Sequence, residues 1–396
     1  MGGLHSSKVE EVWKSDARYA MEAGTFCVVC GSPFDIEGDV YNIDPKDIRF
    51  QWLNNLRLLG SMADVAEHMV ASEGSIPVNV SGLPDIYLSE IASFSLTGSG
   101  YFRIVDDAGQ DDIWFDALSY TGDHGTLFPL HEGCIVTSCR VIEHRYSTKR
   151  EVGLEPTLKI LYRLLSTRFD QRKCCPDESN ETSNDIFDLC SFSSEYGARS
   201  VLALSRLDWW GGKYDKFYTD PIEGKSTASF VQRVLQSSPR RRDEPEYVLK
   251  ATREPQRLER LPTEMMDAIC SYLPIQSVIA LHRTSKALAL RIPLDSVFWR
   301  NSLRDGSLHP HIWDLDTKWI EHHLSNPNAA LSDPTASWDW KVAAKLLATK
   351  RFSISGCDDR LLDVPDGFWN RCRIWATIEE ALQEQDTTLQ CRASQR

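Results

Sequence analysis

The sequence lacks any run of apolar residues of membrane-spanning length, any secretory signal at its start, and any internal repeat of the leucine-rich, WD or kelch type. The first absence predicts no transmembrane segment. The second predicts a reducing, intracellular location in the cytoplasm, the nucleus or both, so the 11 cysteines are expected to stay free or to bind metal rather than to form disulfides. The third absence predicts that the chain has none of the repeat solenoids or propellers that commonly recruit protein targets.

Positive charge and catalytic motifs are also scarce. The chain has 44 Lys and Arg against 57 Asp and Glu, a formal charge of −13, whereas nucleic-acid binders generally show a basic face. We therefore expect no nucleic-acid partner. A Gly-rich phosphate loop, a nucleophile elbow and an HExxH helix are all missing, so we predict no catalytic residue. An enzyme with dispersed catalytic residues stays as an alternative, because such residues leave no local signature.

The length of 396 residues and the 42% hydrophobic content predict two or three globular units of α+β class. Strands are predicted at 101–105 and 113–115, and helices at 65–70, 155–167, 340–350 and 369–382. The predicted ranges are 1–170, an α+β region; 171–256, a mixed segment with a loop and a basic linker at Arg240–Arg242; 257–303, three short helices; and 304–396, a Trp-rich, mainly helical region.

A first pair of cysteines is typical of a zinc site. Cys27 and Cys30 are separated by two residues, so both thiolates can reach one tetrahedral ion. Gly31 permits the turn that aims backbone N–H groups at the sulfurs. One pair is not a complete site, so a second pair is needed.

The second pair is expected at His131 and Cys134, again with two residues between them, and Cys139 is an alternative ligand. Because roughly 100 residues lie between the two pairs, we expect a metal ion that joins distant segments of one domain rather than a compact zinc finger. A second interpretation stays open: Cys27 and Cys30 are small buried hydrophobes in a strand, and His131 is an ordinary core or surface histidine.

Three short amphipathic helical segments lie between residues 261 and 300. The first begins at Pro262 and ends before Pro274, and the second ends before Pro293. Apolar residues recur at steps of three and four in both segments. Those of the first are Leu261, Met265, Met266, Ile269, Tyr272 and Leu273; those of the second are Val278, Leu281, Leu288 and Ile292. The third segment has Leu294, Val297, Phe298 and Trp299, of which Trp299 is suited to anchor a partner.

This stretch resembles the F-box family, the adaptor-binding module of cullin-based ubiquitin ligases. The resemblance is carried by Leu-Pro-x-Glu from Leu261, Tyr-Leu-Pro up to Pro274, Ser-Lys at Ser285 and Phe-Trp-Arg up to Arg300. It implies a three-helix fold that binds a Skp1-type adaptor and, through it, a cullin. The implied adaptor contacts are Leu261, Pro262, Ile269, Leu273, Pro274, Leu281 and Trp299.

The function implied by the resemblance is a substrate-recruiting subunit of an SCF ubiquitin ligase, which brings an unknown protein target to ubiquitin-dependent degradation. Many fungal F-box proteins also have an N-terminal Cys-x-x-Cys-Gly and a later His-x-x-Cys after an aromatic-Pro element, as at Phe128 here. That similarity implies that the four predicted zinc ligands meet. The alternative from another class is an interaction protein outside any ligase, stabilised by a structural zinc.

The start of the sequence fits the loose pattern for myristoylation of Gly2 after removal of Met1, with Lys8 as a basic neighbour. Chance is the preferred explanation of so short a pattern. A single acyl chain would in any case give only marginal membrane binding.

Overall fold

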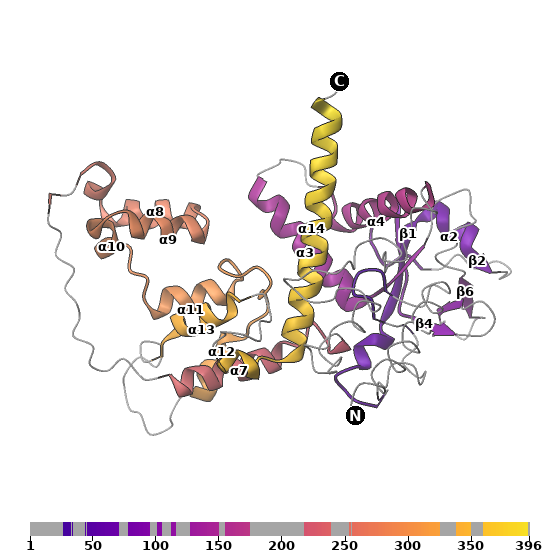
Figure 1. Cartoon of the computed structure of the whole chain (residues 1–396), viewed down its shortest axis with the longest axis horizontal. Coiled ribbons are helices and arrows are strands. Elements are labelled where there is room, and N and C mark those ends of the chain that lie inside the picture. The colour runs from indigo at the N-terminus through magenta and orange to yellow at the C-terminus, as the bar shows by residue number, and fades with distance from the viewer. Residues whose placement is uncertain are drawn as a thin grey trace, which may run out of the picture. The chain divides into compact units, whose positions relative to one another are not determined.

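The structure is a computed structural model of the whole chain, and it divides into two compact units (Figure 1). The first, called here the sheet unit, comprises Met1–Ile222, Arg351–Ile354 and Asp366–Arg396. The second, the helical unit, comprises Glu223–Lys350 and Ser355–Pro365. The structure describes residues 27–32, 34, 44, 46–70, 78–95, 101–104, 112–115, 127–149, 155–174, 218–238, 253–254, 256–324, 338–349 and 359–394. Gly2 and Arg240–Arg242 lie outside these ranges.

The described strands of the sheet unit form one antiparallel sheet. They are β1 (Leu56–Ser61), β2 (Met69–Val70), β3 (Ile86–Leu88), β4 (Ala92–Ser95), β5 (Tyr101–Ile104), β6 (Ile113–Phe115) and β7 (Phe128–His131). The order along the sheet is β2-β6-β5-β4-β1-β3, and β7 also pairs with β1. Together with the helices, this sheet confirms the predicted α+β class, and β5 and β6 confirm the two predicted strands.

Alternating burial explains the pairing of β5 with β6. Phe102 and Ile104 are buried while their neighbours are half-exposed, and they lie opposite Phe115 and Ile113. Such cross-strand apolar pairs on one face are the main stabilising units of a sheet. The strand β1 differs, because it is paired on both sides and buries Leu58 and Leu59 in succession. It is the centre of the sheet.

The helices of the sheet unit are η1 (Gln51–Asn54), α2 (Met62–His68), α3 (Glu132–Lys149), α4 (Thr157–Cys174) and α14 (Asp366–Ser394). The long helix α14 packs along α3 and also contacts α4 (Figure 1). The helix predicted at 65–70 begins earlier, at Met62, because Ser61 and Asp64 form a capping box at its start. It ends at His68, and the prediction was wrong for Met69 and Val70, which form β2 and pair with β6. The helices predicted at 155–167 and 369–382 are present and longer than expected. No described helix has the length and hydropathy that crossing a membrane requires.

The helical unit contains η4 (Arg257–Arg260), η5 (Asp359–Asp363) and seven α-helices among its described residues. These are α7 (Gly224–Ser237), α8 (Thr263–Tyr272), α9 (Ile275–Thr284), α10 (Lys286–Arg291), α11 (Ser296–Arg304), α12 (Thr317–Leu324) and α13 (Trp340–Leu347). Helix α7 packs against α12 and α13, and α11 packs against α13. Helix α13 matches the prediction for 340–350.

The second predicted helical segment, between Pro274 and Pro293, is divided in the structure. Ser285 adopts extended backbone (φ −155°, ψ 156°) and separates α9 from α10. Its hydroxyl accepts a hydrogen bond from the Leu288 N–H at 3.2 Å, which makes it the N-cap of α10. The stretch predicted as three helices therefore contains four, because a serine can satisfy the free N–H groups of a new helix start.

The division into units also differs from the predicted ranges at the C-terminus. Helix α14 belongs to the sheet unit, whereas the sequence grouped it with 304–396. Conversely, α7 belongs to the helical unit, although it lies in the range 171–256. The reason in both cases is side-chain burial against distant segments, which local periodicity does not reveal.

Candidate functional site

A tight turn presents the first two candidate ligands. Cys27 donates its N–H to the Ser32 carbonyl at 3.0 Å, and Gly31 donates to the Cys27 carbonyl at 2.7 Å. Gly31 has φ +68°, a conformation that favours glycine. The Ser32 N–H then points at the Cys30 sulfur, 3.4 Å away. The predicted turn with an N–H aimed at a sulfur is therefore present, and it replaces the strand of the alternative interpretation.

The other two candidate ligands lie where β7 ends and α3 begins. His131 is the last residue of β7 and pairs with Leu56 of β1, and Cys134 lies in the first turn of α3. Gly133 stands between them, and a Cβ at that position would lie 3.2 Å from both the Trp52 ring and the Pro221 side chain. A glycine thus lets this strand-to-helix corner pack closely.

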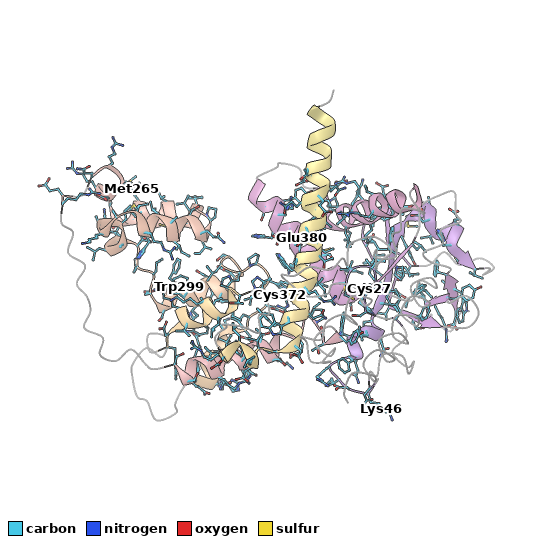
Figure 2. All side chains as sticks on the ribbon, in the orientation of Figure 1. Cys27, Lys46, Met265, Trp299, Cys372 and Glu380 are labelled. Carbon is cyan, nitrogen blue, oxygen red and sulfur yellow. The ribbon has the colours of Figure 1, made fainter. Side chains whose placement is uncertain are left out.

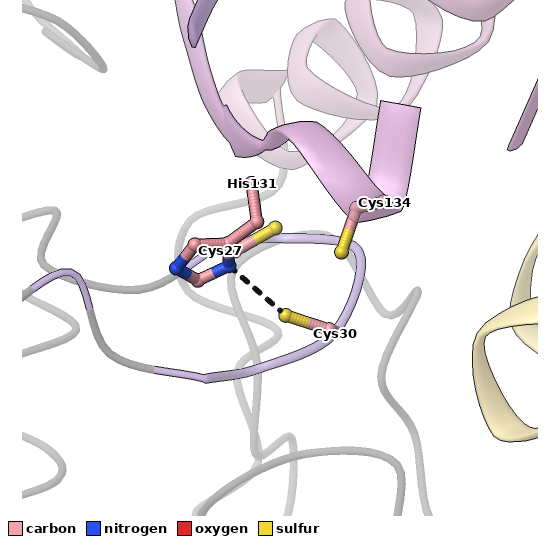
Figure 3. Close-up of side chains that lie close together, drawn as sticks. All are labelled: Cys27, Cys30, His131 and Cys134. Carbon is pink, nitrogen blue, oxygen red and sulfur yellow. Dashed lines mark hydrogen bonds between the residues drawn. The ribbon is translucent and has the colours of Figure 1, made fainter. Parts of the chain in front are cut away.

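The four residues come together in one buried cluster (Figure 3). Their ligand atoms all lie within 4.8 Å of one another, and each residue is at most 1% exposed. The Cys30 Sγ is 3.3 Å from the His131 Nδ1. The structure therefore brings together the four residues that spacing predicted. Cys139 lies outside this group, since it follows Cys134 by five positions along α3 and so points to another face of the helix.

Charge within the cluster is balanced internally. Burial alone would raise the pKa of Cys30, but hydrogen bonds from Cys134 and Cys27 and the charge of His131 hold that pKa well below its usual range. Burial would lower the pKa of His131, yet the negative charges of Cys30 and Cys27 and the hydrogen bonds with them together outweigh burial and raise the pKa to about 10. Burial, with the neighbouring sulfurs, raises the pKa of Cys134. A sulfur anion in this dry site thus requires a positive neighbour.

The donor set fits a tetrahedral metal ion. Ligand atoms about 2.0 to 2.3 Å from one zinc ion are about 3.3 to 3.8 Å apart, so separations within 4.8 Å need only small side-chain adjustments. A divalent ion would replace the thiol protons and allow all three sulfurs to be thiolates beside a neutral imidazole. The cluster can therefore hold a metal ion.

The predicted adaptor contacts lie in the helical unit, where part of the stretch forms its own apolar core. Met266, Val278, Leu288 and Ile292 are buried together, and Leu261, Leu281 and Phe298 pack against them. Ile269 is half-buried, and the prolines at positions 262 and 274 are exposed. The predicted apolar stripe of the first helix is therefore divided between an inner and an outer side.

Helix α8 and its C-cap residue Leu273 expose three large apolar side chains. Met265 is 51% exposed, Tyr272 81% and Leu273 37%. Trp299 on α11 differs, because it is only 8% exposed. Its indole N–H donates to the Leu294 carbonyl at 3.0 Å, and the Lys341 ammonium lies 6.0 Å from its ring. Figure 2 labels Met265 and Trp299 on their helices. The assignment of Trp299 as an adaptor contact stays a prediction, and in this conformation its ring is packed inside the unit.

Sequence patterns missed two charged residues beside these sites. Glu259 is buried, and its carboxylate accepts hydrogen bonds from the Ser285 hydroxyl at 2.5 Å and from two Arg253 nitrogens at 2.7 and 2.9 Å. Arg373 of α14 is buried and donates to the Cys30 carbonyl at 2.6 Å. Both stand in charged or helical stretches that resemble solvated surface, so no local signal marks them.

Comparison of the chain with protein-family models, with curated proteins and with solved structures gave no match.

Proposed function

We propose that this chain is an F-box-type, substrate-recruiting subunit of an SCF ubiquitin ligase. Helices α8–α11 would bind a Skp1-type adaptor and, through it, a cullin. The regions on either side would present a protein target to the ligase. The proposal assigns no bond-making or bond-breaking step to this chain, and its sequence support is the residue order from Leu261 to Arg300.

The observation that carries the proposal is the outer side of α8. The helix already anchors itself through Met266, which is fully buried. Met265, Tyr272 and Leu273 nevertheless face solvent, and Pro274 beside them is exposed as well. Large apolar side chains exposed on one helix and at its C-cap are consistent with a surface that another molecule covers. Their place within the F-box-like residue order supports the adaptor as that molecule.

We propose further that the ion of the Cys/His cluster is a structural zinc. The donors are three sulfurs and one imidazole, the kind of set that zinc prefers. Four protein ligands close a tetrahedral site, so no position is left for water or substrate, as catalysis would require. The role is to join the turn at Cys27 to the corner at His131, about a hundred residues along the chain.

The adaptor proposal is tested by co-elution of the full chain with a purified Skp1-type adaptor–cullin complex. Leu273→Asp should weaken adaptor binding more than about 100-fold, because the interface would bury an unpaired charge at a cost of several kcal/mol. Leu362→Asp is the matched control, since Leu362 lies on η5 and is more exposed than Leu273. Failure of the unmutated chain to bind the adaptor would refute the proposal.

The zinc proposal is tested by elemental analysis of the purified full chain. One zinc per chain is expected, and removal with a strong chelator should unfold the sheet unit, because metal binding and folding are coupled. Protein that is folded and contains no stoichiometric metal would refute the proposal.

A further inference from the structure

A buried arginine from the C-terminal helix contacts the candidate metal centre. Arg373 of α14 is 3% exposed. One guanidinium nitrogen, Nη1, donates to the Cys30 carbonyl at 2.6 Å, and the other, Nη2, donates to the Asn370 side chain at 2.8 Å. Asn370 in turn donates its amide N–H to the Thr219 carbonyl at 2.8 Å. The arginine is therefore held in place from its own helix while it holds a ligand residue of the cluster.

The contact point matters for coordination. The Cys30 carbonyl belongs to the turn that presents both Cys27 and Cys30, so fixing it fixes the direction of two sulfurs. Three thiolates and one divalent ion also leave a net charge of −1 in a dry site, because −3 and +2 sum to −1. A buried guanidinium bonded to the same turn offsets that charge. Outer residues that orient ligands and balance charge contribute strongly to metal affinity.

We propose that Arg373 is a positioning residue of the metal centre, through which the ion and helix α14 stabilise each other. The metal site then has three parts, which are the turn at Cys27–Cys30, the corner at His131–Cys134, and the C-terminal helix more than 230 residues further on. Because coupling between two binding events is reciprocal, loss of the contact weakens the metal and loss of the metal loosens the helix. This inference rests on the proposed zinc and is independent of the adaptor proposal.

A neighbouring residue provides a matched comparison. Arg371 also lies on α14, is 2% exposed, and donates from Nε to a backbone carbonyl. Its acceptor is Pro221, which is not a ligand residue. The two arginines therefore share their residue type, helix, burial and kind of hydrogen bond, and they differ in whether the acceptor belongs to the metal-binding turn.

The test measures zinc affinity of full-length variants by competition with a chromophoric chelator. Arg373→Met should weaken zinc binding by about 10- to 100-fold, the usual effect of losing an outer-shell partner. Arg371→Met should lower the melting temperature of the zinc-loaded protein without a comparable loss of affinity. Arg373→Lys should recover part of the affinity, since lysine keeps the charge and one donor.

A spectroscopic signal separates positioning from general destabilisation. In Co²⁺-loaded protein, Arg373→Met should shift the visible absorption bands of the ion, while Arg371→Met should leave them unchanged. Equal losses of zinc affinity in the two Met variants, or unchanged affinity and spectrum in Arg373→Met, would overturn the inference. If Arg373→Met does not fold, an unaltered zinc affinity in Arg373→Lys would overturn it as well. An unmutated protein that binds no zinc would overturn both this inference and the zinc proposal.

Discussion

Each unit holds one group of residues in an unusual environment, and the two environments are opposite. The sheet unit buries groups that normally contact water, including His131, Arg371 and Arg373. The helical unit exposes groups that are normally buried, including Met265 and Tyr272 of α8. Both arrangements cost free energy in an isolated chain, since a buried polar group needs a partner and an exposed apolar one orders water.

The difference between these buried polar groups and these exposed apolar groups indicates what kind of binding partner each unit requires. Sulfurs and an imidazole that converge inside a dry core are completed by something small and positive. Under the proposed function, another protein covers the apolar side chains that helix α8 exposes. Under the proposed function, an ion completes the first unit and a protein partner covers the second, and the predictions below compare the two units with matched variants.

The largest effect is expected from removing a ligand. Cys30→Ser should abolish stoichiometric zinc and unfold the sheet unit, because structural zinc supplies about 10 kcal/mol or more of folding free energy in zinc-finger peptides. Cys139→Ser, a cysteine outside the cluster, should keep both the metal and the fold. Elemental analysis and near-ultraviolet circular dichroism measure the two outcomes. Equal metal content in Cys30→Ser and Cys139→Ser would contradict the assignment of Cys30 as a metal ligand.

Adjacent methionines test the inner and outer sides of α8. Met266 is fully buried, so Met266→Ala should lower the free energy of unfolding by about 2 to 5 kcal/mol. Met265 is half-exposed, so Met265→Ala should change it by less than about 0.5 kcal/mol while weakening adaptor binding. Chemical denaturation and calorimetric titration with the adaptor give the two readouts. Weaker adaptor binding only by the Met266 variant would argue against the outer side of α8 as the docking surface.

Two glycines at helix starts compare packing in the two units. A Cβ at Gly367, near the start of α14, would lie 2.3 Å from the Asp220 carbonyl oxygen, so Gly367→Ala should destabilise the sheet unit by about 1 to 3 kcal/mol. At Gly224 of α7 the nearest atom would be 3.4 Å away, so Gly224→Ala should be neutral or stabilising by up to about 1 kcal/mol. Thermal unfolding distinguishes them, and a neutral or stabilising effect of Gly367→Ala would contradict the close packing of α14.

The smallest effect concerns the carboxylate that braces the F-box-like stretch. Hydrogen bonds from Ser285, the Gln256 N–H and Arg253 lower the pKa of Glu259 from 4.5 to about 2. Its stabilising contribution is therefore present above about pH 4.5 and is lost as the pH falls toward 2. Glu259→Gln should be less stable than the unmutated protein at pH 7, and the difference should shrink over that interval. Ser285→Ala should give a smaller change in the same direction. If the free energy of unfolding depends on pH identically in Glu259→Gln and in the unmutated protein, the bracing role is disproved.

The sequence predicted features that repeat locally or follow fixed spacing. The strands β5 and β6 follow from alternating apolar residues, and the metal cluster follows from two pairs with the same two-residue gap. Helix α14 was expected over 369–382 from periodicity. In each case a short pattern carries the physical requirement, either one apolar face or two sulfurs that reach one ion.

Features that depend on distant packing were not predictable. Arg373 lies in a helical pattern like any solvated arginine, and only the fold brings it to Cys30, 343 positions away. The break at Ser285 was missed because the apolar steps continue across it, although the serine caps a new helix. Likewise, the stripe of α8 does not reveal which of its apolar residues face the core, because it is wide enough to cover both sides.

The most direct measurement is native mass spectrometry of the full chain purified together with a Skp1-type adaptor. The account predicts one chain, one zinc ion and one adaptor molecule in the same complex. It also predicts that increasing collision energy removes the adaptor first and leaves the ion, because the ligands are buried and the α8 side chains are on the surface. A folded chain whose mass shows neither the ion nor the adaptor would contradict it.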